Sequence, residues 1–150
     1  MSNNSYFFLV LALVAGMMMP TQGAINTKLA AYVENPVSAA FISFAVGTVA
    51  LFIYLIATGI PLSNLANAKE APLIAWTGGL LGAFFVSAVA SSVPRIGVAM
   101  TFSLVIAGQM LITLFLDHFG FLGVPVKEIS LVRVLGVTLI TVGVILIRKF

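Results

Sequence analysis

The sequence predicts an all-α membrane protein in which five transmembrane helices form a compact bundle. Of the 150 residues, 61% are hydrophobic and only 7% are charged, whereas roughly a quarter of the residues in a soluble domain are charged. The mean hydropathy is +1.21, and the apolar residues form long unbroken runs rather than the short alternating segments of a membrane β-barrel. This composition excludes a soluble enzyme, a nucleic-acid-binding protein, a disordered chain and a disulfide-stabilised scaffold.

Five stretches contain about the 20 mainly apolar residues that a helix needs to cross the hydrocarbon core. The segments between them are too short to form an extramembrane domain, so residues 1–150 are expected to be a single transmembrane domain. Consecutive helices joined by such short loops are antiparallel neighbours. The expected spans are residues 6–33, 36–58, 72–93, 97–116 and 131–147.

Basic residues near the span ends are almost evenly divided between the two sides of the membrane. The side that holds the N-terminus carries three Lys or Arg and the other side carries four, so the preference for a cytoplasmic C-terminus is weak. Two five-helix units in opposite orientations would form the inverted repeat that many secondary transporters use. The near balance therefore fits insertion in both orientations and an antiparallel dimer. The alternative is a parallel or monomeric protein whose few charges balance by chance.

Residue types that support catalysis or bind cofactors are scarce. The chain has no Cys, one His and four acidic residues, which excludes a disulfide and makes a protein-only metal site improbable. We therefore expect no cofactor and no enzymatic activity. A membrane enzyme would need an acid/base group at one interface, and Asp117 with His118 is the one candidate pair in the sequence.

Polar side chains inside membrane spans cost free energy and are candidates for functional sites. Gln22 and Asn26 are four residues apart and share a face of the first helix. Pro20 lies close by, and because it lacks an N–H donor it is expected to kink or break that helix. Gln109 occupies the middle of the fourth span. Gln22, Asn26 and Gln109 are therefore candidates for lining a substrate-binding cavity; the alternative is that these amides hydrogen-bond helices to one another.

Charged residues near the span ends are weaker candidates. Lys28 is expected to extend to the lipid headgroups, and Arg95 is expected to anchor there too, with entry into a vestibule as the alternative. Asp117 and His118 end the fourth span, where local hydrogen bonds at the helix end are favoured over a proton relay. Lys28, Arg95 and Asp117 are retained as candidates for coupling or gating.

Five short segments, read together, cover almost the whole chain in order. They are residues 20–26 (PTQGAIN), 43–48 (SFAVGT), 78–83 (GGLLGA), 107–109 (AGQ) and 117–120 (DHFG). This combination resembles the five-helix YdcZ-type branch of the drug/metabolite transporter superfamily. The last span, with Gly136 and Gly143, is similar to the dimerisation helix of the small multidrug resistance transporters of that superfamily.

The resemblance implies a multi-pass protein of the bacterial inner membrane that exports a small organic metabolite or drug. It also implies a homodimer, or a heterodimer with a related chain, with Gly136 and Gly143 at the dimer seam and alternating access to a central site. The small multidrug resistance transporters carry a membrane-embedded Glu in their first helix, and this chain has none there, so coupling through that carboxylate is not implied. A non-transporting membrane scaffold or small accessory subunit is the alternative function.

Overall fold

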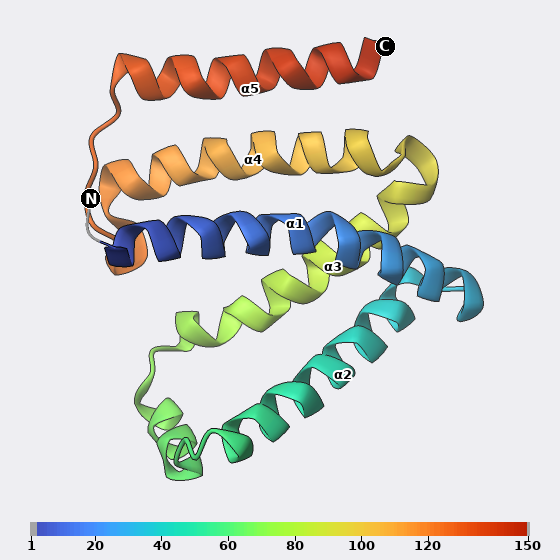
Figure 1. Cartoon of the computed structure of the whole chain (residues 1–150), viewed down its shortest axis with the longest axis vertical. Helices are drawn as coiled ribbons and strands as arrows, with labels where there is room; N and C mark the ends of the chain where they lie inside the picture. Colours follow the sequence, from blue (N-terminus) through green and yellow to red (C-terminus); the bar gives the residue numbers. More distant parts are fainter. Residues whose placement is uncertain (1–2, 150) are drawn as a thin grey trace. The chain divides into compact units, whose positions relative to one another are not determined.

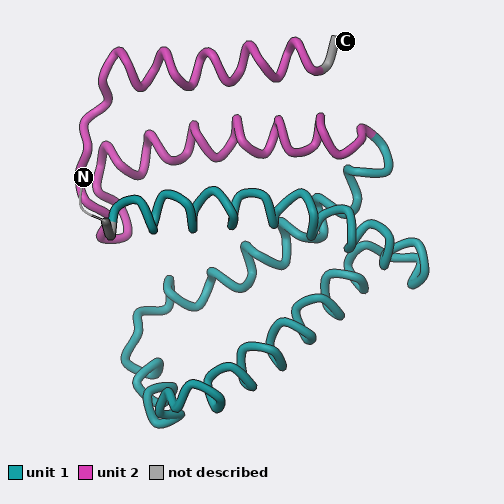
Figure 2. The backbone as a smooth tube through the Cα atoms, viewed as in Figure 1, with its two compact units in different colours: residues 1–95 teal, residues 96–150 magenta. Residues whose placement is uncertain are grey.

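The computed structural model describes residues 3–149, which are helical apart from their loops and contain no strand (Figure 1). Contacts within the chain divide it into two compact units, Met1–Arg95 and Ile96–Phe150 (Figure 2). The long helices are α1 (Asn3–Tyr32), α2 (Pro36–Ala57), α3 (Gly78–Ile96), α4 (Val98–Phe119) and α5 (Leu131–Lys149). Short 3-10 helices are η1 (Leu62–Glu70), η2 (Leu73–Thr77) and η3 (Phe121–Gly123).

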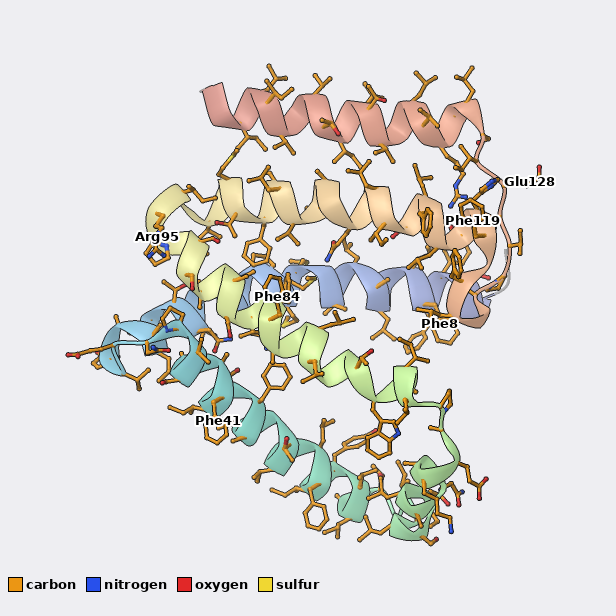
Figure 3. All side chains as sticks on the ribbon, turned by 180° about the vertical axis from the view of Figure 1, so that it is seen from behind. Phe8, Phe41, Phe84, Arg95, Phe119 and Glu128 are labelled. Carbon is orange, nitrogen blue, oxygen red and sulfur yellow. The ribbon has the colours of Figure 1, made fainter. Side chains whose placement is uncertain are left out.

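Four helical segments are long and apolar enough to cross a membrane: Ser5–Tyr32, Pro36–Ala57, Leu73–Ile96 and Val98–Phe119. The fifth predicted span corresponds to a shorter apolar helix, Leu131–Ile147. Large apolar side chains project from these helices, among them Phe41, which is 76% exposed, and Phe84, which is 74% exposed (Figure 3). Such extensive apolar surface is unfavourable in water and suits a lipid environment. The prediction of an all-α, multi-pass protein is therefore confirmed.

Pro20 and Pro94 lie inside continuous helical segments. α1 runs unbroken through Pro20, so the break that the sequence allowed does not occur, although Pro20 cannot donate to the carbonyl of Gly16. The Thr21 hydroxyl donates to the carbonyl of Met17 over 3.1 Å in the same turn. α3 continues through Pro94 to Ile96, whereas the sequence predicted an end at residue 93. A bend at Pro20 remains a prediction.

The turn between α1 and α2 is defined by the two residues predicted to form it. Glu34 has a backbone φ of 55°, which lies in the left-handed region. Asn35 then caps α2: its Oδ1 accepts hydrogen bonds from the backbone N–H of Val37 over 2.8 Å and of Ser38 over 3.1 Å. Pro36 follows as the first helical residue, where its missing N–H is not needed. Asn35 and Pro36 thus define where α2 begins.

Small and β-branched residues form the buried part of unit 1, which allows its helices to approach closely. At Gly82 of α3, an added Cβ would lie 3.1 Å from Cζ of Phe44 on α2. At Gly78, four residues earlier on α3, an added Cβ would meet no atom within 4 Å. The buried apolar residues of unit 1 are Ala30, Ala39, Ala40, Val86, Val89, Ala90 and Val93.

Unit 2 consists of α4 and α5, which lie side by side and antiparallel (Figure 1). Gly120 ends α4 in the left-handed conformation with φ of 62°, the usual way for a helix to stop. Phe102 and Thr101 are buried near the start of α4, and Val144 is buried on α5.

Candidate functional site

Gln22 and Asn26 of α1 line the same recess, together with residues of α3. The two amides are four residues apart on a continuous helix, which puts them on one face. The opposite wall is apolar and comes from α3. The complete lining is Met19, Gln22, Gly23, Asn26, Phe85, Val86 and Val89.

Asn26 is the buried polar side chain of this recess. It is 3% exposed, and its Nδ2 atom has no hydrogen-bond partner. A buried donor without an acceptor costs about 1–3 kcal/mol, and inside hydrocarbon the side chain has no bulk water as an alternative partner. The site therefore favours any group that brings an acceptor oxygen to Nδ2 of Asn26.

The recess is small. The space open to the centre of a water molecule is about 10 Å³, which is room for roughly one water or for one polar group of a larger molecule. Gln22 is exposed and Asn26 is buried, so Gln22 lies at the rim and Asn26 at the bottom. Gln109, the third predicted lining residue, is half-buried on α4 and belongs to unit 2.

A larger groove of about 530 Å³ continues along the same two helices towards their C-terminal ends. Thr27 of this groove directly follows Asn26 of the recess on α1, and Ala90 directly follows Val89 on α3. The groove is lined by Thr27, Ala30, Ala31, Glu34, Pro36, Ala90, Ser91, Pro94 and Arg95.

Arg95 lies at the end of α3 (Figure 3) and borders this groove, where its guanidinium donates to the carbonyl of Ser91. Arg95 is exposed, and both the headgroup anchor and the vestibule remain predictions for it. Glu34 borders the groove as well, and the sequence analysis did not single it out as a site residue. The signal that was available is an acidic residue in a two-residue turn, in a chain with only four acidic residues.

The charged groups at the end of α4 hold the loop between α4 and α5. Asp117 forms an ion pair with Arg133 at the start of α5, instead of the local hydrogen bond expected at the helix end. Its backbone carbonyl accepts from the Lys127 N–H over 2.8 Å, and Arg133 donates to the Lys127 carbonyl over 3.0 Å. Nδ1 of His118 accepts from the Ile129 N–H over 3.4 Å. In the part of the chain that the structure describes, no three His, Asp or Glu side chains are grouped to hold a metal ion.

The remaining predicted residues lie on helix surfaces. Lys28 is exposed on α1. Gly136 lines a groove of about 240 Å³ between α4 and α5. A Cβ added at Gly136 or at Gly143 would meet no atom within 4 Å, so both glycines leave space beside α5. Their place at a dimer seam remains a prediction.

Residues 7–146 match the family model described as "Putative inner membrane exporter, YdcZ". Because the match covers almost the whole chain, the chain belongs to this family. It is a multi-pass protein of the inner membrane in a family of exporters. Among curated proteins and among solved structures, nothing matches the chain.

Proposed function

We propose that this member of the YdcZ exporter family is a secondary-active transporter that moves a small organic metabolite or drug past Asn26 and Gln22. The observation that supports this proposal is the donor at Nδ2 of Asn26, which is buried beside a recess and has no acceptor. A hydroxyl, carbonyl or carboxylate oxygen of a solute would satisfy this donor and offset its desolvation. Gln22 at the rim supplies a second amide for the same solute.

The transporting assembly that we propose is a dimer of two five-helix halves. The near balance of Lys and Arg between the two sides favours opposite orientations of the two copies. Rocking of the two halves about the polar site would expose it alternately to the two compartments. The open space beside Gly143 is consistent with close approach of α5 to a second chain, and Gly136, which borders the groove between α4 and α5, is the second glycine that we assign to this seam. In this assembly, Gln109 would complete the lining and Pro20 would allow α1 to bend.

Coupling would involve the charged residues near the recess or at the helix ends. α1 contains no carboxylate, and Lys28 is its one charged side chain. Lys28 and Arg95 are the cations nearest to the recess along α1 and α3, which keeps both as candidates for gating. Asp117 already pairs with Arg133, so any gating by Asp117 would require this pair to open.

The alternative function is a non-transporting scaffold in which the amides join helices. An amide that joined α1 to α3 would donate to an acceptor on α3, yet Nδ2 of Asn26 makes no such bond. This observation favours a ligand site over a helix contact.

Flux into proteoliposomes tests the proposal, with a panel of small organic solutes and the purified full chain. Asn26→Ala and Gln22→Ala are expected to reduce flux of the transported solute by about tenfold or more, the effect of losing a hydrogen bond in an apolar site. Asn67→Ala is the matched control, because Asn67 is an exposed asparagine on η1, outside the recess. Unchanged flux in both recess variants would refute the assigned site, and absence of flux for every solute would favour the scaffold.

A further inference from the structure

The groove next to the recess has one charged side chain of each sign and is otherwise uncharged. Glu34 comes from the turn after α1, and Arg95 comes from the end of α3. Thr27 and Ser91 add hydroxyl groups whose protons are donated to backbone carbonyls of their own helices, so their oxygens remain available as acceptors. The other lining residues are Ala30, Ala31, Pro36, Ala90 and Pro94, whose small side chains leave the groove open.

Among the side chains of residues 5–147, which the structure describes, the ion pair present is that of Asp117 with Arg133, and neither charge of the groove takes part in one. Arg95 uses one N–H to reach the carbonyl of Ser91, and a guanidinium has five such donors in all. Glu34 carries a carboxylate that only accepts hydrogen bonds when ionised. The groove therefore presents an anionic acceptor and a cationic donor, each with capacity for a partner.

The backbone at Glu34 supports a role for its carboxylate. Its φ of 55° is in the left-handed region, where glycine or asparagine costs less free energy than a residue such as glutamate. Strained positions of this kind tend to occur at functional sites. The fold of the turn would be satisfied by glycine, so the presence of glutamate points to a use for the side chain.

We infer that this groove is the entrance to the Asn26 recess and that it binds a small zwitterion. The anionic end of the solute would pair with Arg95 and its cationic end with Glu34. A simple anion would leave Glu34 unpaired and be repelled by it, and a simple cation would meet the same problem at Arg95. This inference rests on the proposed function in one respect: it takes the solute to move on from the groove to Asn26 along α1 and α3.

Calorimetric titration of the full chain in nanodiscs of phosphatidylglycerol tests the inference, because this lipid has no cationic headgroup. The probes are linear ω-amino acids from glycine to aminocaproate, with the carboxylic acid and the amine of the same length as half-ligands. At the best length, the amino acid is expected to bind about tenfold more tightly than either half-ligand, which is the effect of one added charge-assisted hydrogen bond.

Selectivity separates ligand contact from a merely structural role. Glu34→Gln is expected to abolish the preference for the amino acid over the carboxylic acid of the same length. Arg95→Gln is expected to abolish the preference for the amino acid over the amine of the same length. Glu34→Gly removes the carboxylate and relieves the left-handed backbone, so it is expected to fold at least as well and to show the same change as Glu34→Gln. Glu70→Gln and Lys69→Gln are matched controls on η1, outside the groove, and are expected to leave binding unchanged.

Several outcomes would overturn the inference. These are no saturable binding of any amino acid, equal binding of amino acid and half-ligands, or unchanged selectivity in the groove variants. Loss of binding in discs of phosphatidylethanolamine would identify a zwitterionic headgroup as the occupant instead of a solute. If Asn26→Ala abolishes flux while the groove variants keep their selectivity, this inference alone fails. If amino acids bind as expected but no solute of the flux panel is transported, the proposed function fails and the groove assignment stands.

Discussion

Replacing Asn26 by leucine separates a ligand site from a helix contact, because the two roles predict opposite effects on stability. Leucine has the same branched side-chain skeleton as asparagine, is larger, and has no polar atoms. Asn26 is 3% exposed and its Nδ2 donor has no partner, so the native protein carries a desolvation cost of about 1–3 kcal/mol at this atom. Asn26→Leu removes that cost, and its larger side chain extends into the open recess, so the free energy of unfolding is expected to rise by up to roughly 1 kcal/mol.

Transport is expected to change in the other direction. The variant cannot donate to a solute oxygen, so flux at low solute concentration is expected to fall by about tenfold. Unfolding would be followed by circular dichroism in detergent micelles against denaturant, and flux in proteoliposomes. Asn67→Leu on exposed η1 serves as the control for the change in residue type. A loss of more than about 1 kcal/mol of unfolding free energy in Asn26→Leu would mean that the amide has a partner in the folded chain, which would refute the reasoning.

Three further predictions concern the ends of the helices and the topology of the chain. Gly120→Ala is expected to destabilise the protein by about 2 kcal/mol, because φ at this position is 62° and the new Cβ would lie 2.7 Å from Cγ2 of Val126. Gly123 has φ of 79° but open space around it. Gly123→Ala is therefore expected to cost about half as much unfolding free energy in the same denaturant titration. Arg133→Gln is expected to lower the unfolding free energy by only about 0.2–1 kcal/mol, because its pair with Asp117 is partly exposed, and the difference is expected to shrink in high salt. Reporter fusions at the C-terminus are expected to give signal from both compartments, and signal from one compartment alone would contradict dual insertion.

Hydropathy predicted the helices well because lipid leaves few alternatives. A segment in hydrocarbon must satisfy its own backbone hydrogen bonds, so a run of apolar residues of sufficient length becomes a helix. The predicted span 6–33 corresponds to α1, Asn3–Tyr32, and the span 36–58 to α2, Pro36–Ala57. Proline predicted the helix ends less well. The helices continue through Pro20 and Pro94, because a missing N–H removes one hydrogen bond and does not by itself end a helix.

The candidate site was only partly predictable from the sequence. Spacing on one helix was enough to put Gln22 and Asn26 on one face, since that relation depends on helical geometry alone. The missing acceptor at Asn26 depends on which residues of α3 face it, and periodicity does not give that information. Periodicity also does not predict that Glu34 borders the groove, since this depends on the geometry of the turn. Nor does it predict Arg133 as the partner of Asp117, because Arg133 lies 16 residues away on α5.

Access to Asn26 from the two sides of the membrane is the most direct test of the transport mechanism. The chain contains no Cys, so Asn26→Cys would introduce the one thiol of the protein. Membrane-impermeant thiol reagents added to either face of oriented vesicles would then report its exposure, with Phe41→Cys on the exposed face of α2 as a lipid-facing control. In an antiparallel dimer the two copies of residue 26 lie in opposite orientations, so the decisive measurement uses reagent on one face alone. Labelling of both copies from that one face, reduced by the transported solute, is the predicted result. Labelling of neither copy, or of no more than half of the copies, would contradict alternating access at this site.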